Sequence, residues 1–264
     1  MTGYLVRPAV RPHRATARPY RVFQGSGCVL IMQFIEKSYC GVRSAVYTLG
    51  KQGSGLQFLL LPMIHVGTKE YYQQVRSRLA TCDLILAEGV DSNNVRLLTN
   101  WYGIVRRAKG IDLVTQEEAL LFKGLKGKIV NADMKGDAFD KGWSGLPLPL
   151  RAFHLAAGPV LASYLLLFGT REMIAEHLGI DDLPSRDEVL NEDEYFDKLY
   201  DLIVDERDKA LLSHITRLDD AASTRKQLVA VLFGARHMRA VSAVLLHRLG
   251  YRILQSEWIP VFEL

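Results

Sequence analysis

The sequence predicts an α/β fold with a central mixed, largely parallel sheet, in which two repeated βαβ units are separated by a helical insertion. Short apolar runs alternate along the chain with longer amphipathic segments, as strands and helices do in α/β proteins. The order strand, histidine, helix, strand, carboxylate also occurs twice, once near each end of the chain. The insertion between the two units covers about residues 146–218.

The chain of 264 residues is long enough for one large core, and we expect a single domain over residues 36–264. Residues 1–35 precede the first acidic residue and carry five arginines and three prolines, so we expect a basic, disordered tail. Two explanations of this tail stay open. It could be an organellar targeting segment, or it could be an upstream extension of a protein whose natural start is Met32.

Charge and cysteine usage exclude several classes of protein. The formal net charge is +4, and removal of the five tail arginines leaves 4 − 5 = −1, so we expect no nucleic-acid partner. The three cysteines form no CxxC pair, which argues against a disulfide framework and a cysteine zinc site. We therefore expect a reducing, cytoplasmic location.

The elements of the first unit follow from local patterns. Residues 45–50 and 56–64 are β-rich and flank the turn sequence KQGSG, which predicts a hairpin. A helix is predicted over residues 69–79, with Thr68 as its cap. Residues 83–87 are predicted to form a strand, because residues 84–87 are continuously apolar, which is typical of a strand that is buried on both faces.

The middle of the chain is predicted to be mostly helical. Helices are expected at about residues 95–108 and 116–123, and a strand at residues 128–132. Residues 150–218 are predicted to be mostly helix, with a capping box at residues 185–188.

One apolar segment, residues 155–170, carries no charged side chain. It is shorter than the roughly 20 residues that span a bilayer, and Gly158 and Pro159 interrupt it. We expect a buried helix here. Peripheral membrane association through residues 155–170 is the less favoured alternative.

The second unit begins with a strand predicted at residues 228–233. A helix follows at residues 238–249 and ends before Gly250. A strand at residues 251–255 completes the unit, and a last strand is predicted near residues 259–262.

Four candidate residues follow strands of the two units. His65 and Glu88 belong to the first unit, and His237 and Glu257 to the second, with spacings of 23 and 20 residues. Because the strands of a βαβ unit are parallel, these side chains should meet at one edge of the sheet, where α/β proteins bind ligands. Asp133 joins them if its strand is also parallel.

These residue types suit a divalent transition metal. Two histidines and one carboxylate favour zinc, manganese or cobalt over calcium. An ionised Glu88 among apolar residues is costly unless it is paired or binds a metal. Arg207 lies beside the apolar stripe of a predicted helix, where it could clamp a substrate or stabilise an oxyanion. The alternatives are structural histidines and a structural ion pair.

Four segments resemble, in chain order, the signature segments of the TraB/PrgY-like and Tiki-like superfamily, which also includes erythromycin-esterase-like and ChaN-like proteins. They are MIHVGT at residues 63–68, LAE at 86–88, VDERD at 204–208 and GARH at 234–237. The ordered match spans about residues 45–264. The final GxxH motif is its most specific part.

The resemblance implies an α/β fold with two GxxH histidines and a carboxylate in a metal-dependent hydrolase site. Carried over by position, these residues are His65, His237 and Glu88, with Arg207 as the arginine of the helical motif. Tiki-like members are regarded as metalloproteases, and TraB/PrgY-like members are linked to inhibition of peptide pheromones. The first motif departs from the family pattern, because Pro62 stands where glycine is usual.

The sequence as a whole predicts a metal-dependent hydrolase that acts on a peptide bond through metal-activated water. Asp133 or Glu257 would be the general base, and Arg207 would stabilise developing negative charge. A non-catalytic module that binds a peptide or small molecule at the same edge is the alternative. A third reading is an interaction protein that uses the apolar segment.

Overall fold

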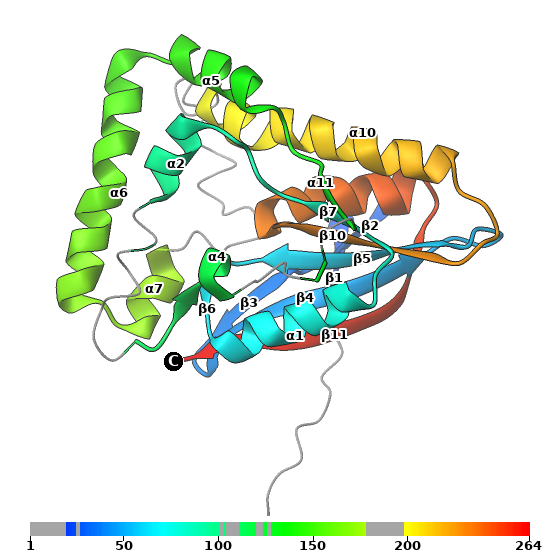
Figure 1. Cartoon of the computed structure of the whole chain (residues 1–264). Coiled ribbons are helices and arrows are strands. Elements are labelled where there is room, and N and C mark those ends of the chain that lie inside the picture. The colour runs from blue at the N-terminus through cyan, green and yellow to red at the C-terminus, as the bar shows by residue number, and fades with distance from the viewer. Residues whose placement is uncertain are drawn as a thin grey trace, which may run out of the picture.

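The computed structural model is a mixed α/β fold built on one seven-stranded sheet (Figure 1). It describes residues 20–24, 27–100, 103, 111–119, 124–125, 128–177 and 198–264. Six strands form the continuous path of the sheet, in the spatial order β11 (Arg252–Glu263), β4 (Gly41–Gly50), β5 (Leu56–Met63), β10 (Gln227–Gly234), β7 (Leu84–Ala87) and β9 (Ile129–Asn131).

Strand directions confirm the predicted mixed, largely parallel sheet. The neighbours β5, β10, β7 and β9 are all parallel. The strand β4 pairs antiparallel with β5, with β11 and with β3 (Ile35–Ser38). Two small antiparallel pairs lie outside this sheet, β1 (Tyr20–Gln24) with β2 (Gly27–Ile31) and β6 (Val66–Gly67) with β8 (Val114–Thr115).

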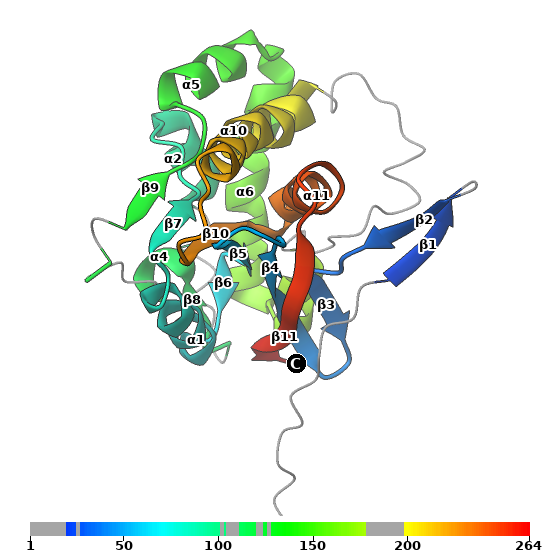
Figure 2. The ribbon, with the colours of Figure 1, turned by 90° about the vertical axis from the view of Figure 1, so that its right-hand side faces the viewer.

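Helices cover both faces of the sheet, with α1 on one side and α10 and α11 on the other (Figure 2). The helices that pack on the sheet, and the short turns continuous with them, are α1 (Lys69–Ala80), η1 (Asp201–Asp205), α10 (Glu206–Asp220), η2 (Ala235–His237), α11 (Met238–Ala243) and η3 (Val244–Arg248). The remaining helices are α2 (Asn93–Thr99), α4 (Gln116–Ala119), α5 (Gly136–Gly145), α6 (Leu148–Phe168) and α7 (Arg171–His177).

Both predicted units are present, and the sheet interleaves them. The first unit is β5, α1 and β7, and β10 of the second unit lies between its two strands. The second unit continues through α11 to β11. The strand β11 pairs antiparallel with β4, and β4 pairs antiparallel with β5, so β11 runs in the same direction as β5. Because β5 is parallel to β10, β11 also runs in the same direction as β10. All four strands of the two units therefore point the same way.

The predicted second strand of the last unit differs from the structure. Residues 251–255 and 259–262 belong to one long strand, β11, which pairs along its length with β4. Glu257 therefore lies in the middle of a strand, opposite Val46, and forms an ion pair with Arg78 at 2.9 Å. The prediction that Glu257 lies past a strand end, where it could act as a general base, was wrong.

The predicted tail boundary at residue 35 is too late. Met32 and Phe34 are buried in the core, and Ile35 begins the strand β3. Residues 1–19 lie outside the described residues, and so does the capping box predicted at residues 185–188. Of the helix predicted at 95–108, residues 101–102 and 104–108 also lie outside them.

The apolar segment is not the buried helix that the sequence led us to expect. It forms α6, which has 21 residues, and only 11% of its most apolar window is buried. Ala162 and Leu165 are its buried residues. Length and composition would allow this one described helix to cross a membrane.

Candidate active site

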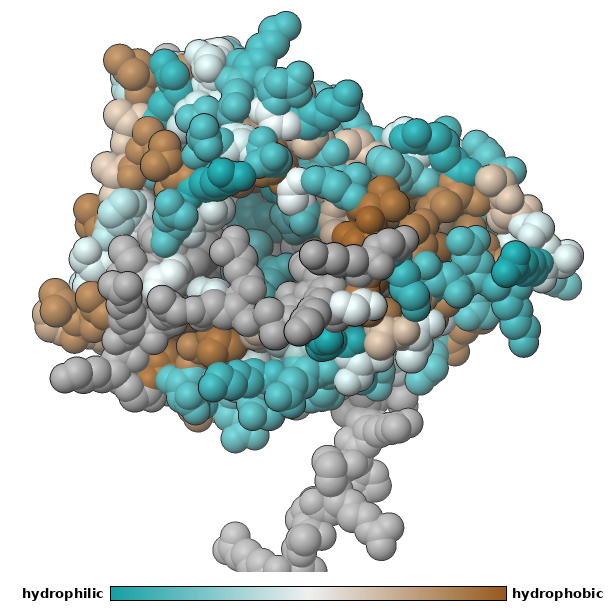
Figure 3. Space-filling model, viewed as in Figure 1, coloured by the Kyte–Doolittle hydropathy of each residue, from teal (hydrophilic) through white to brown (hydrophobic). Residues whose placement is uncertain are grey.

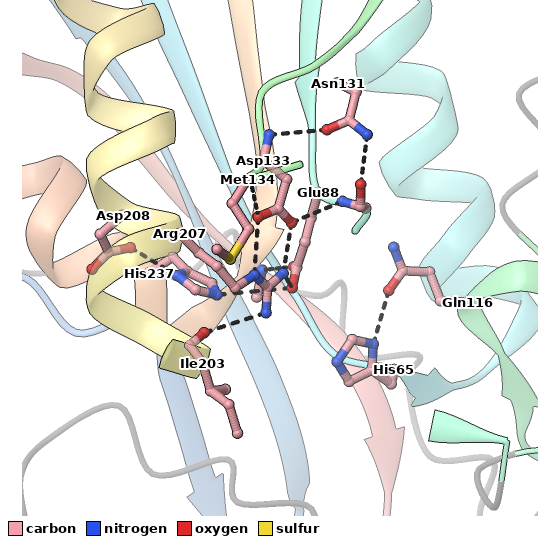
Figure 4. A network of polar contacts seen from close by, with 12 residues as sticks. His65, Glu88, Gln116, Asn131, Asp133, Met134, Ile203, Arg207, Asp208 and His237 are labelled. Atoms are coloured by element: carbon pink, nitrogen blue, oxygen red, sulfur yellow. Dashed lines mark hydrogen bonds and ion pairs between the residues drawn. The ribbon is translucent and has the colours of Figure 1, made fainter. Parts of the chain in front are cut away.

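The carboxyl ends of the four parallel strands meet at one edge of the sheet. In the register of β10 with its neighbours, Gly234 lies opposite Met63, and Leu232 lies opposite Ala87. The residues that follow these strands therefore reach the same edge, which is where His65, Glu88, Asp133 and His237 are found (Figure 4). This confirms the prediction that both histidines follow parallel strands at the same edge of one sheet.

Arg207 reaches the edge from α10 and binds two carboxylates. Its Nε donates to Asp133 Oδ1 at 3.0 Å, and its Nη2 donates to Asp133 Oδ2 at 2.7 Å and to Glu88 Oε1. Its Nη1 donates to the Ile203 carbonyl at 3.4 Å. Burial alone would lower the pKa of Arg207, but the charges of Glu88 and Asp133 raise it above its ordinary value. Each guanidinium nitrogen is engaged within the protein, so Arg207 holds the carboxylates in place.

Asp133 is saturated with hydrogen bonds. Besides the two from Arg207, it accepts one from the backbone N–H of Gly89 at 3.0 Å and one from that of Met134 at 2.8 Å. Its side chain is 0% exposed. Four donors occupy its two oxygens and the side chain has no access to solvent or substrate, so this geometry supports a structural role for Asp133 and not the predicted role of general base.

Glu88 lies at the centre of the network. Its Oε2 accepts a hydrogen bond from the Gly234 backbone N–H at 2.6 Å, and its Oε1 faces both Arg207 and His237. Burial raises the pKa of Glu88, but the charges of Arg207, His237 and His65 and the Gly234 N–H outweigh burial and lower the pKa to about 2. Glu88 is therefore ionised at neutral pH.

His237 is held by a residue that the sequence analysis did not assign, Asp208. The His237 Nδ1 lies 2.7 Å from Asp208 Oδ1, and both side chains are almost fully buried. Because a carboxylate oxygen accepts this bond, Nδ1 carries a proton, and Nε2 faces Glu88 Oε1 at 3.8 Å. That distance is too long for a direct hydrogen bond.

A signal for Asp208 was present in the sequence. Leu211 and Ile215 lie three and seven residues further along α10, and both are fully buried. Helical spacing places Asp208 on this same buried face. A carboxylate on such a face needs a partner, which here is His237 from a different element.

His65 is exposed and lies beside the network. Its Nδ1 contacts Gln116 Oε1 at 3.2 Å, and Gln116 begins the helix α4 (Figure 4). Its charge helps to lower the pKa of Glu88, so the two side chains are within electrostatic reach. Across the described parts of the chain, no three His, Cys, Asp or Glu side chains are grouped so that they could hold one metal ion.

The side chains at this edge meet only some of the requirements of a divalent transition metal site. Two ligands of a tetrahedral ion with bonds of about 2.1 Å lie roughly 3.4 Å apart, close to the 3.8 Å between His237 Nε2 and Glu88 Oε1. A carboxylate on the other ring nitrogen, as Asp208 provides, is the usual support of a metal-bound histidine. The guanidinium of Arg207 shares Glu88 Oε1, so a cation would compete with it for that oxygen.

The molecule is hollowed beside this edge. The space-filling view shows a recess with a hydrophilic floor in the region where the ribbon view places the carboxyl end of β5 and the helix α2 (Figures 1 and 3). Comparison with protein-family models, with curated proteins and with solved structures found no significant match for this chain.

Proposed function

We propose that this protein is a metal-dependent hydrolase of the TraB/PrgY-like type that cleaves peptide bonds. One observation carries the proposal: the buried pair Asp208–His237 presents a ring nitrogen to the ionised Glu88, at the edge of the sheet where α/β proteins bind ligands. The order of the motifs that contain His65, Glu88, Arg207 and His237 supports the choice of family.

Each residue has a physical role in this proposal. His237 and Glu88 would hold the metal, and the exposed His65 would complete the set from the neighbouring strand. Zinc, manganese or cobalt bound there would lower the pKa of water and polarise the scissile carbonyl. Asp208 keeps His237 in the tautomer that presents Nε2, and Arg207 orients Glu88.

The test combines metal analysis with hydrolysis assays on libraries of peptides and esters, using the full chain with manganese, cobalt or zinc. Glu88→Gln and His237→Ala should each abolish metal-dependent turnover, and Asp208→Asn should reduce it by roughly 10- to 100-fold. His247→Ala, which removes an exposed histidine on η3, is the matched control and should leave turnover unchanged. If the wild type shows neither metal affinity nor turnover, the proposal fails.

A second candidate function is a non-catalytic module that binds a peptide or small molecule at the same edge. The ion pair between Arg207 and Glu88 favours it, because this pair already neutralises the carboxylate without a metal. Ligand binding that survives chelation and His237→Ala, with no chemical change in the ligand, would decide for this candidate.

A further inference from the structure

The helix α6 exposes large apolar side chains along its length. Its outer face, as we name it, consists of five residues that share one side of the helix by spacing and are exposed by 48% to 72%: Phe153, Val160, Tyr164, Leu167 and Phe168. Hydrophobic residues accordingly follow the left edge of the molecule, where the ribbon view shows α6 (Figures 1 and 3). The chain contains no Asp, Glu, Lys or Arg between Arg151 and Arg171.

The polarity of α6 is the reverse of that of an ordinary surface helix. Its two basic residues, Arg151 and His154, turn inward, and within the described structure their buried Nε and Nε2 atoms have no hydrogen-bond partner. Ala162 and Leu165 share this inner face. A helix on the surface of a soluble protein turns its polar side to water, whereas α6 turns its apolar side out. The outer face is therefore stabilised by removal from water.

The connectivity of the sheet excludes a membrane-spanning α6. The strand β10 follows α6 in the chain, and it pairs between β5 and β7, which precede α6. Ile174 and Ala175, which follow α6 closely, are also buried in the core formed by β5 and β10, so both ends of α6 stay on the same side of any bilayer. A helix that crossed would pull β10 out of the centre of the sheet, so α6 can only lie along a surface.

The size and chemistry of the outer face disfavour a protein partner. A helix of 21 residues is roughly 31 Å long and about 10 Å wide, so a second copy would bury about 300 Å² per partner, against about 800 Å² for a standard interface. A protein interface of ordinary composition also forms about one hydrogen bond per 100–200 Å². Among the five outer-face side chains, only the Tyr164 hydroxyl could form one.

We propose that the outer face of α6 lies in the interfacial layer of a membrane, parallel to its plane, with Phe153, Val160 and Leu167 inserted among the acyl chains. Because the outer face carries no charge, the attraction is hydrophobic, and a neutral phosphatidylcholine surface is sufficient. This inference is independent of the proposed hydrolase activity.

The test is flotation of the full chain with vesicles of phosphatidylcholine, and in parallel with vesicles that also contain phosphatidylglycerol. The wild type should float with both. A variant with Phe153→Ser, Val160→Ser and Leu167→Ser should have a partition coefficient for these vesicles that is lower than that of the wild type by about tenfold or more. The matched control carries Tyr39→Ser and Leu254→Ser, which remove exposed apolar residues elsewhere, and should float like the wild type. Circular dichroism checks that both variants are folded.

Three results would overturn the proposal. The wild type could fail to float with neutral vesicles, the triple variant could float as well as the wild type, or a lipid-free dimer could form that the triple variant abolishes. Flotation with anionic vesicles but not with neutral ones would also contradict the proposal, because it would assign the binding to the basic residues before Glu36. If the triple variant does not fold, Leu167→Trp replaces it: brominated phosphatidylcholine should quench its added fluorescence more strongly than that of Leu254→Trp, and equal quenching would contradict membrane contact.

Discussion

At the scale of single residues, Arg207 compensates two buried carboxylates at once. Its removal would leave Glu88 and Asp133 uncompensated in a site with little access to water. We therefore expect Arg207→Met to lower the free energy of unfolding by roughly 3–5 kcal/mol, as measured by urea denaturation. Lys209→Met on the same helix is the control, because its ion pair with Glu206 is exposed and should contribute less than about 1 kcal/mol. Equal, small losses in both variants would show that the network is not a structural unit.

The low pKa of Glu88 makes the stability of the fold depend on pH. Because folding lowers this pKa from 4.5 to about 2, the contribution of Glu88 is fully present above about pH 4.5 and is lost as the pH falls toward 2. The difference in the free energy of unfolding between wild type and Glu88→Gln should thus shrink between neutral pH and about pH 3. A difference that stays constant over this range would contradict the assigned pKa.

At the scale of elements, the structure agrees with the sequence where a signal is local. The predicted cap of α1 is confirmed: Thr68 Oγ1 accepts from the Tyr71 N–H and also donates to the Val261 carbonyl at 2.9 Å. Thr68→Ala should lower the free energy of unfolding by about 1–2 kcal/mol, whereas Thr68→Ser, which keeps the hydroxyl, should lower it much less. Equal thermal shifts in the two variants would assign the effect to the lost methyl group.

Elements that depend on distant partners could not be predicted in the same way. The strand β11 continues through Glu257 because β4 supplies hydrogen-bonding partners along the whole length of β11. No local sequence pattern indicates this pairing. Helical spacing marks Asp208 as buried, but its pairing with His237, 29 residues away, has no local signal. The hairpin of β4 and β5 and the buried strand β7 were predictable, since turn residues and apolar runs define them locally.

At the scale of the whole molecule, the topology brings the candidate site together. Insertion of β10 between β5 and β7 makes His65, His237 and Glu88 neighbours at one edge. The sequence predicted the shared edge from the repeated units, but the exposure of α6 could not be predicted, because an apolar run has the same local pattern in a buried helix and in an exposed one.

If the site binds a metal only in the folded state, the ion must stabilise the whole protein. Cobalt at about 100 times its dissociation constant should raise the free energy of unfolding by about 2.7 kcal/mol. The thermal midpoint should rise in the wild type and in His247→Ala, and it should not rise in Glu88→Gln. A rise of the same size in Glu88→Gln would place the ion elsewhere.

The most direct test of the proposed site is anomalous diffraction from crystals of the full chain grown with cobalt. We expect one anomalous peak about 2.0–2.2 Å from His237 Nε2, with Glu88 Oε1 as a second ligand and the Arg207 guanidinium displaced from that oxygen. A crystal with the ion pair between Arg207 and Glu88 intact, and with no peak at His237 under saturating cobalt, would contradict a metal-dependent mechanism.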